Sequence, residues 1–318
     1  MAGEDRVIGI DLGGTNLRAA VVSMDGTLTC RKSVPSGAVD GPDAVIERMA
    51  RLITAVAGEA GVAGDAPVGV ASPGPLSPRT GIVHFTPNLP GWFDVPLRDR
   101  LSAATQRPVV VDNDANCATM GEARFGAARG ASDIVYLGLG TGVGGGVMTK
   151  GVLVDGSLGL GGELGHVVVA MDGPRCTCGS VGCLEAFVSG WAIGREGAAV
   201  AATADGAAIR EAAGDQPVTA SAVAQAAVAG DPSARSILER AGIALGAAIG
   251  GFINTFNPDL IVIGGGLVAV GDLVLEPARR TIPRHSFRAL RDHARLVLAQ
   301  LGDDSGLYGA AAIALERA

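Results

Sequence analysis

Three apolar runs in this 318-residue chain each lead directly into a glycine-rich turn. The runs cover residues 7–12, 134–139 and 260–263, and the turns cover 13–14, 140–146 and 264–266. Glycine lets backbone N–H groups approach a phosphate closely and adopt positive φ. A lone glycine turn most often only reverses the chain, but three such turns, each after a strand, favour phosphate-binding loops.

The first two of these turns are followed at once by another apolar run, at 17–22 and, after Gly146, through Met148. Strand, tight turn and strand is a β-hairpin pattern, and its recurrence predicts a duplicated core. None of the turns matches G-x-x-x-x-G-K-[ST], which excludes a P-loop NTPase. Gly140-x-Gly142-x-x-Gly145 imitates the dinucleotide fingerprint, but a strand and not a helix follows it, which excludes a Rossmann site.

The remaining pattern alternates strands and helices. We predict strands at 28–34, 68–71, 109–111 and 296–298, helices at 42–60, 95–105, 115–125 and 309–317, and a mainly helical region at 189–256. The proline- and glycine-rich stretch 73–91 is expected to be a long ordered loop. We expect a small α/β domain of residues 1–112 plus 303–318, and a large α/β domain of residues 113–302.

Composition narrows the functional class. With 48% hydrophobic and 18% charged residues, the chain is expected to be globular. The net charge of −7, without a basic stripe, argues against nucleic-acid binding, and the only lysines are Lys32 and Lys150. We see no export signal, and the apolar stretch 241–256 is predicted to be a buried helix. These features predict a cytoplasmic protein with no membrane attachment, whose five cysteines stay reduced.

One histidine and three cysteines lie within 18 residues, at His166, Cys176, Cys178 and Cys183. A Cys3His set suits tetrahedral zinc, and four protein ligands would make the metal structural and not catalytic. Three unrelated thiols are the alternative, which the spacing and the intervening glycines disfavour. Glu163 and Glu185 bracket the cluster, and as carboxylates outside the ligand set they could bind a polyhydroxylated substrate.

Three polar residues have two interpretations each. Asp114 lies between a predicted strand and helix, where it could take a proton from a hydroxyl or cap the helix, and the residues alone leave both open. Asp11 ends an apolar strand and is either a solvated strand end or an outer-sphere partner of Mg²⁺. Asn88 either contributes to a ligand pocket or serves turn formation.

The motifs together resemble a known superfamily. Residues 8–16 look like the first phosphate motif of the actin, Hsp70 and sugar-kinase superfamily, 136–146 resemble its second phosphate motif, and 260–266 resemble its adenosine motif. The segment from Glu163 to Glu185 is similar to the signature of the ROK family, and within it to the bacterial sugar kinases. The resemblance covers nearly the whole chain, with the motifs in the family's order.

This resemblance implies an actin-like, ribonuclease H-like fold with two lobes, each a mixed sheet flanked by helices, and a ligand cleft between them. It assigns Asp114 as the general base. It implies that the sugar ligands are Gly74, Asn88, Asn113, Asp114, Glu163, His166 and Glu185. It implies that the ATP and Mg²⁺ site holds Asp11, Gly13, Gly14, Thr15, Asn16, Thr141, Gly142, Gly265 and Gly266.

The activity implied is ATP-dependent phosphorylation of D-glucose at its 6-hydroxyl, with ATP, Mg²⁺ and structural Zn²⁺, in a homodimer or homotetramer. Kinases of the same fold that take an N-acetylhexosamine or fructose, or that use polyphosphate, remain alternatives. A sugar-sensing regulator of the same family is the non-enzymatic alternative. Such regulators carry an N-terminal helix-turn-helix, and the first phosphate motif here begins near residue 7, which leaves no room for one.

Overall fold

The structure, a computed structural model, describes residues 6–86 and 88–318. The chain divides into two compact units, each with its own strands and helices. The first unit comprises residues up to 132 with 146–162 and 299–318, and the second comprises 133–145 and 163–298. The first unit includes residues 113–132, which the sequence-based boundary near residue 112 assigns to the other domain.

The first unit is built on a five-stranded mixed sheet in the order β3-β2-β1-β4-β8. Its strands are β1 (Arg6–Leu12), β2 (Asn16–Ser23), β3 (Leu28–Pro35), β4 (Val68–Ser72) and β8 (Val109–Asn113). β1 and β2 form the predicted antiparallel hairpin, whereas β1, β4 and β8 run parallel. Parallel neighbours need a crossover between them, which is why helices intervene in the sequence.

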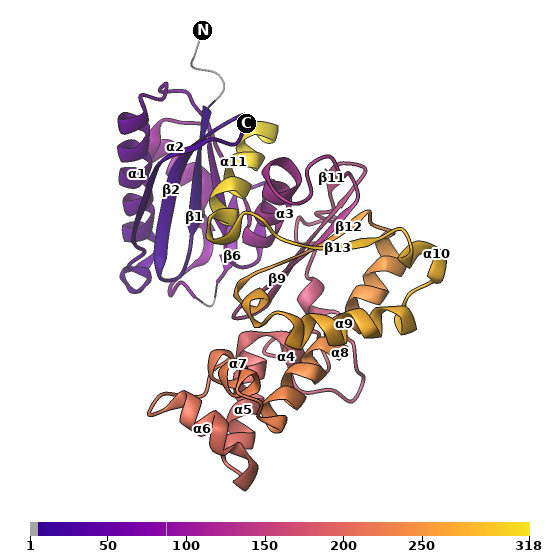
Figure 1. Cartoon of the computed structure of the whole chain (residues 1–318). Coiled ribbons are helices and arrows are strands. Elements are labelled where there is room, and N and C mark those ends of the chain that lie inside the picture. The colour runs from indigo at the N-terminus through magenta and orange to yellow at the C-terminus, as the bar shows by residue number, and fades with distance from the viewer. Residues whose placement is uncertain (1–5, 87) are drawn as a thin grey trace. The chain divides into compact units, whose positions relative to one another are not determined.

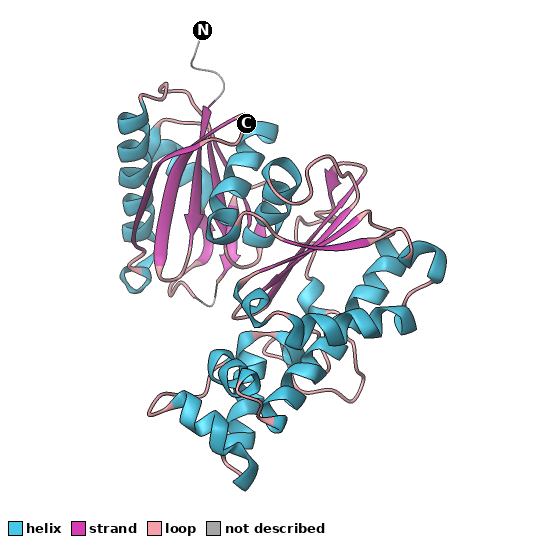
Figure 2. Cartoon of the chain, viewed as in Figure 1, coloured by secondary structure: helices cyan, strands magenta, loops and turns pink. Residues whose placement is uncertain are grey.

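Helices cover both faces of this sheet (Figures 1 and 2). They are α1 (Gly41–Ala60), α2 (Leu97–Thr105), α3 (Asp114–Phe125) and α11 (Ser305–Arg317). The predicted apolar face of α1 is buried, including Val45, Met49 and Ile53. On the other face α11 approaches very closely, because Gly9 and Gly69 are paired on β1 and β4 beneath it. A Cβ at Gly69 would lie 1.7 Å from the carbonyl oxygen of Ala310.

The stretch 73–91 is not the continuous loop that its prolines and glycines predict. It contains β5 (Leu76–Ser77) and β6 (Ile82–Phe85), which form a three-stranded antiparallel sheet with β7 (Phe93–Pro96). These strands have two to four residues each. Strands this short carry too few residues for an alternating pattern to be visible, so the turn residues dominate the sequence signal.

The second unit contains three parallel strands, with β12 between β9 and β13. Their bounds are β9 (Ile134–Leu139), β12 (Leu260–Gly264) and β13 (Arg295–Leu298). The chain after β9 turns into β10 (Val143–Thr149), which continues into the first unit and pairs antiparallel with β11 (Val152–Leu153). The second predicted strand–glycine turn–strand therefore has the expected local order.

Most of the second unit is helical, as predicted for 189–256 (Figure 2). The helices are α4 (Glu185–Val188), α5 (Gly190–Ala201), α6 (Ala207–Ala213), α7 (Ala220–Val228), α8 (Pro232–Phe256), α9 (Asp272–His285) and α10 (Arg288–Arg291). Within the described residues, α8 is the one helix long and apolar enough to cross a membrane. Of that apolar stretch 67% is buried by the rest of the protein, as predicted for a core helix.

Candidate functional site

Parallel pairing gathers polar residues at one edge of the first sheet. Ala71 on β4 pairs with Asp11 on β1 and with Asp112 on β8. Gly74 follows the end of β4 by two residues, and Asp114 directly follows the end of β8. Both therefore lie just beyond the paired residues. Because parallel strands end at the same edge of a sheet, this edge collects several predicted ligand and catalytic residues, as in open α/β sheets generally.

The start of α3 shows which residue caps the helix. Asn113 is the N-cap, and its Oδ1 accepts hydrogen bonds from the backbone nitrogens of Ala115 at 2.9 Å and Asn116 at 3.4 Å. Asp114 is the first residue of the helix and is exposed, with its Oδ1 2.8 Å from the nitrogen of Ala115. The capping role therefore belongs to Asn113. Asp114 lies at the exposed start of the helix, and its role as a base stays a prediction.

Asp112 and Arg317 support this edge, and no sequence pattern indicated either role. Asp112 is fully buried, and its Oδ1 accepts from the backbone nitrogen of Asn113 at 2.7 Å and from Nδ2 of Asn116 at 2.9 Å. Its other oxygen pairs with Arg317, on α11. Buried carboxylates require such partners. The ion pair spans 205 positions of sequence, so no local pattern could have revealed it.

The turn between β1 and β2 is held open toward solvent. The nitrogen of Gly13 donates to the oxygen of Asn16 at 3.0 Å. Ser36 fastens the turn from outside, since its Oγ donates to the oxygen of Gly14 at 2.6 Å and its nitrogen donates to the oxygen of Thr15 at 2.8 Å. Thr15 and Asn16 are exposed. The turn thus offers backbone and hydroxyl donors in a fixed arrangement that suits an anion.

Asp11 lies at the start of this turn in an unfavourable setting for a charge. Its side chain is 23% exposed, and burial raises the pKa of its carboxyl group. Arg18, 3.6 Å away, opposes the shift, while the charge of Asp304 adds to it. A nearby cation would stabilise the ionised form of this partly buried carboxylate, and Mg²⁺ is a suitable cation.

Asn88, from the proline-rich segment, lies beside the same turn. A Cβ at Gly14 would be 3.1 Å from the Cβ of Asn88 and 3.2 Å from its carbonyl oxygen. The predicted sugar-loop residue and the predicted phosphate turn are therefore neighbours within one unit.

A comparable edge exists in the second unit. β9 and β12 are parallel, with Gly138 opposite Gly264, so the turns that follow them leave the sheet together. Gly265 has φ of 87°, and a Cβ there would lie 2.3 Å from the carbonyl oxygen of Leu139. Only glycine fits this position. The backbone nitrogen of Gly190, at the start of α5, donates to the oxygen of Gly140 at 2.8 Å, which fixes the first turn against the helix.

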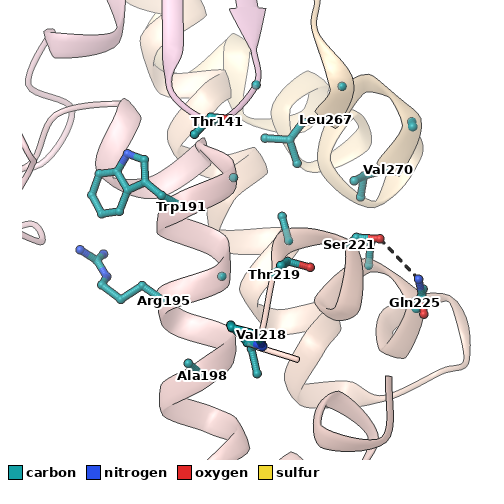
Figure 3. Close-up of a pocket in the computed structure, with 18 of the residues that line it drawn as sticks. Thr141, Trp191, Arg195, Ala198, Val218, Thr219, Ser221, Gln225, Leu267 and Val270 are labelled. Carbon is teal, nitrogen blue, oxygen red and sulfur yellow. Dashed lines mark hydrogen bonds between the residues drawn. The ribbon is translucent and has the colours of Figure 1, made fainter. Parts of the chain in front are cut away.

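A cavity of about 1350 Å³ opens beside these turns (Figure 3). Its lining includes Thr141 and Gly266, two of the residues predicted for ATP. The remaining walls come from α5, α7 and the turn after β12, with Trp191, Arg195, Ala198, Val218, Thr219, Gln225 and Leu267 among the lining residues. The sequence analysis missed these walls, because they are ordinary helix and loop residues scattered between positions 190 and 270. The predicted residues Gly142 and Gly265 do not line the cavity, although each adjoins a residue that does.

Trp191 and Arg195 form one wall, both on α5 (Figure 3). The guanidinium carbon of Arg195 lies 4.9 Å from the centroid of the Trp191 ring, a cation–π arrangement. Arg195 also donates to the backbone oxygens of Arg175 and Ala186, each at 3.2 Å. The wall is therefore held in place by interactions independent of any ligand.

The four predicted metal ligands come together. Each of the four residues offers one donor atom, a ring nitrogen or a sulfur, and these four atoms lie within 4.8 Å of one another. The residues are His166, Cys176, Cys178 and Cys183. Cys178 Sγ is 3.7 Å from Cys183 Sγ, and Cys176 Sγ is 3.7 Å from Nδ1 of His166. Bonds of about 2.3 Å to sulfur and 2.0–2.1 Å to nitrogen place tetrahedral ligands roughly 3.5–3.8 Å apart. The donor set and its spacing therefore fit a tetrahedral metal ion.

The surroundings shift the pKa values of the three thiols in different directions. Burial raises the pKa of Cys183 to about 11 and also raises the pKa of Cys176, whereas a hydrogen bond from the backbone of Ser180 lowers the pKa of Cys178. Metal ligation requires thiolates, so binding releases protons. A divalent cation would supply the positive charge that favours the thiolate forms of the buried Cys176 and Cys183.

His166 directs its two ring nitrogens to different neighbours. Nδ1 faces the cysteine sulfurs, and Nε2 lies 4.0 Å from Oε2 of Glu163. The Glu163 side chain is 61% exposed. Metal ligation through Nδ1 would fix the ring and leave Nε2–H as a donor beside this exposed carboxylate. This is the arrangement that the sequence predicts for binding a hydroxylated ligand.

Glu185, a predicted sugar ligand, is buried and already hydrogen-bonded to other parts of the protein. It is 8% exposed, and its Oε2 accepts from the backbone nitrogen of Val143 at 2.9 Å. Its Oε1 accepts from Thr177 Oγ1 at 3.2 Å and from Trp191 Nε1 at 3.4 Å. One carboxylate thus connects the cysteine loop, the second glycine turn and the cavity wall. A sugar hydroxyl would have to share Oε1 with the two longer of these bonds.

The predicted sugar ligands are divided between the two units. Gly74, Asn88, Asn113 and Asp114 belong to the first, whereas Glu163, His166 and Glu185 belong to the second. In the first unit Asn88 lies beside Gly14, and in the second Glu185 lies beside Gly142 and His166 beside Cys176. Their assembly into one sugar site stays a prediction.

Comparison with known proteins agrees with this architecture. The ROK family model matches residues 7–317. The glucokinase of Thermotoga maritima is 40% identical over 98% of this chain and 98% of its own. The crystal structure of a ROK hexokinase from Thermus thermophilus is similar with a TM-score of 0.82 and 36% identity, over 96% of this chain and 97% of that one. That of a ROK family glucokinase from Streptomyces griseus in complex with glucose and AMPPNP has a TM-score of 0.81 and 32% identity, over 98% and 99%.

These likenesses extend over nearly the full length of each relative, so they concern the whole architecture and not one motif. They confirm the predicted fold class, the α/β fold of ROK sugar kinases in the actin-like superfamily. The chain belongs to the ROK family.

Proposed function

We propose that this protein is an ATP-dependent glucokinase, which converts D-glucose and MgATP to glucose 6-phosphate and ADP. The observation that carries this proposal is 40% identity with a glucokinase along the whole chain. The related structure with glucose and AMPPNP supports the choice of both substrates. The position of Asp114 as an exposed carboxylate at the start of a helix supports the chemistry.

Asp114 acts as the general base in this proposal. It accepts the proton of the glucose 6-hydroxyl as that oxygen attacks the γ-phosphorus of ATP, and the bond to the ADP oxygen breaks in line. Phosphoryl transfer needs mainly positioning and charge stabilisation from the protein. The hydrogen bonds of Asn113 and the buried Asp112 hold the start of α3 and hence the base. Sugar binding would then draw the two units together and exclude water, which could otherwise be phosphorylated.

The nucleotide is proposed to bind in the cavity lined by Trp191 and Arg195, with its phosphates toward the glycine turns. The cavity walls are mostly aliphatic and aromatic, which suits a purine and ribose better than a polyphosphate chain. Thr15 and the amide of Gly14 would contact phosphate from the other unit, while the amide of Gly13, which donates to Asn16, would hold the turn in shape. Asp11 would hold the waters of Mg²⁺, which neutralises the phosphate oxygens when bound.

Glucose is proposed to contact Gly74, Asn88, Asn113, Asp114, Glu163, His166 and Glu185. Zinc is proposed as the metal held by His166 and the three cysteines, where it would fix the aim of the imidazole. With four protein ligands it has no open position, so it supplies rigidity and not chemistry. We further propose a cytoplasmic homodimer or homotetramer, a location consistent with reduced thiols at the metal cluster.

The choice of substrates is tested by a panel. We expect phosphorylation of glucose by ATP to exceed that of N-acetylmannosamine, N-acetylglucosamine and fructose by at least about tenfold in kcat/KM, because one mismatched hydroxyl contact is worth this much. A coupled assay with ATP, ADP, GTP and polyphosphate as donors measures this. A clear preference for another sugar or for polyphosphate would replace the glucokinase assignment with one of those kinases.

Removing the base isolates the chemical step. Asp114→Asn should lower kcat by roughly 10²–10⁴-fold, the usual contribution of a positioned general base, with little change in either KM. The side chain keeps its size, so the melting temperature should stay close to that of the wild type. The exposed Asp65→Asn serves as the matched control. An Asp114→Asn enzyme with wild-type kcat would remove the residue from the mechanism.

The metal cluster makes a prediction about content and affinity. Purified protein should carry about one zinc per chain, and Cys178→Ser should lose it, because three ligands hold the ion less tightly than four. Loss of zinc should raise the KM for glucose, because the His166 ring is then no longer held by the metal. The KM for ATP should be less affected. Cys30→Ser, outside the cluster, is the control that retains zinc. Elemental analysis measures the zinc content, and steady-state kinetics measure both KM values. A metal-free wild-type protein with full activity would contradict the proposed role of zinc.

The nucleotide cavity can be filled without cutting any interaction. Ala198 lines the cavity and Ala199 does not, although both are exposed on α5. Ala198→Trp should raise the KM for ATP by about tenfold or more and leave the KM for glucose nearly unchanged, because the new ring occupies the space proposed for the base. Ala199→Trp should behave as the wild type. Equal KM values for ATP in the two variants would place the nucleotide elsewhere.

A further inference from the structure

Glu122 is a fully buried acid on α3, two turns after Asp114. Its Oε1 accepts hydrogen bonds from the backbone nitrogens of Gln300 at 3.0 Å and Leu301 at 2.9 Å. Its Oε2 accepts from the nitrogen of Ala127 at 2.7 Å and, at 3.2 Å, from the same Gln300 nitrogen. These backbone donors satisfy a charge that burial would otherwise make very costly.

The three donors belong to the segments through which the chain passes between the two units. The chain enters the second unit at residue 133, shortly after Ala127, and returns to the first unit at residue 299, next to Gln300. The backbone oxygen of Glu122 also accepts from the nitrogens of Gly126 at 3.1 Å and Ala128 at 3.0 Å. One residue therefore holds both connections, although they lie more than 170 positions apart.

A third passage touches the same helix. β10 crosses into the first unit at Gly146, where a Cβ would lie 2.1 Å from Oγ1 of Thr119. Thr119 is fully buried on α3, one turn before Glu122. Of the four places where the chain changes unit, at 132/133, 145/146, 162/163 and 298/299, three therefore adjoin α3.

We propose that Glu122 is a positioning residue that fixes the pivot between the two units on the helix that carries the catalytic base. Hinges are a few residues at element ends that absorb a conformational change. Connections bonded to one rigid carboxylate can bend only beyond their bonded amides, which limits where the chain can flex between the units. This role rests on the proposed glucokinase activity, because its purpose is to bring the phosphoryl donor into line with Asp114 during closure.

A carboxylate suits this role better than its amide. Both carboxylate oxygens of Glu122 accept hydrogen bonds from backbone N–H groups. In glutamine one of these oxygens becomes an NH₂ group, which would face the N–H of either Ala127 or Leu301 and repel it. Glu122→Gln should therefore release one connection while keeping the size of the side chain. Glu122→Asp keeps both oxygens but shortens the reach, and should give an intermediate result.

The test compares Glu122→Gln and Glu122→Asp with Glu47→Gln, an exposed glutamate on α1, as the matched control. Amide hydrogen exchange is measured at 126–132 and 299–304, X-ray scattering is measured with and without glucose, and steady-state kinetics are recorded. We expect at least about tenfold faster exchange in one or both segments, a smaller glucose-induced compaction, and a kcat lowered by roughly ten- to hundredfold, the cost of misplacing reacting groups by about 1 Å.

A Glu122→Gln enzyme that exchanges faster or melts earlier, yet compacts with glucose and turns over as the wild type does, would make Glu122 merely structural and overturn the proposal. If that variant does not fold, Glu122→Asp is judged by the same criteria. Should neither fold, wild-type exchange decides, because segments that exchange as fast as the exposed loop 63–65 cannot be anchored. A wild type that does not phosphorylate glucose would instead refute the proposed function, and the exchange data would still report on the anchor.

Discussion

The parallel pairing of strands is the constraint on which the candidate site depends. In the first unit, β1, β4 and β8 run side by side, so the chain leaves all three at one edge of the sheet. In the second unit, β9 and β12 do the same. Side chains that are distant in sequence thereby acquire fixed neighbours, with Asp11 at the level of Asp112. A one-residue change of register would turn every side chain of a strand to the other face and dismantle this edge.

Glu185 shows how one buried carboxylate can link several functional elements. Its bonds to Val143, Thr177 and Trp191 join the glycine turn, the cysteine loop and the cavity wall. A change in the metal loop would therefore reach the nucleotide side of the second unit without a long pathway. The proposed contact with sugar adds to this network, because a hydroxyl that shares Oε1 would weaken its longer bonds to Thr177 and Trp191. Sugar and nucleotide sites would then be coupled through a single side chain.

Local patterns predicted what local interactions determine. The cysteine cluster was readable because its ligands lie within 18 residues, and the first hairpin and α1 were readable from their periodicity. The choice of Asn113 over Asp114 as cap was not readable, since both residue types favour that position. The cavity walls and the Asp112–Arg317 ion pair were also hidden, because their partners are far apart in sequence. The roles of the site residues and their assembly across the two units remain predictions that depend on family resemblance.

The glycine content, 49 residues, has a physical origin that goes beyond the phosphate turns. Gly69 lets α11 lie against the sheet, and Gly121 meets the backbone of Gly309, where a Cβ would be only 2.9 Å from its nitrogen. Because glycine has no side chain, the backbones meet directly at these contacts. The direct contact fixes the distance between α3, α11 and the sheet. Since α3 begins with Asp114 and carries Glu122, the same glycines that shorten these distances also reduce the freedom of the proposed base and of the connections between the units. Rigidity at this helix is therefore built from the smallest residues, in a chain with only 3% aromatic residues to fill a core.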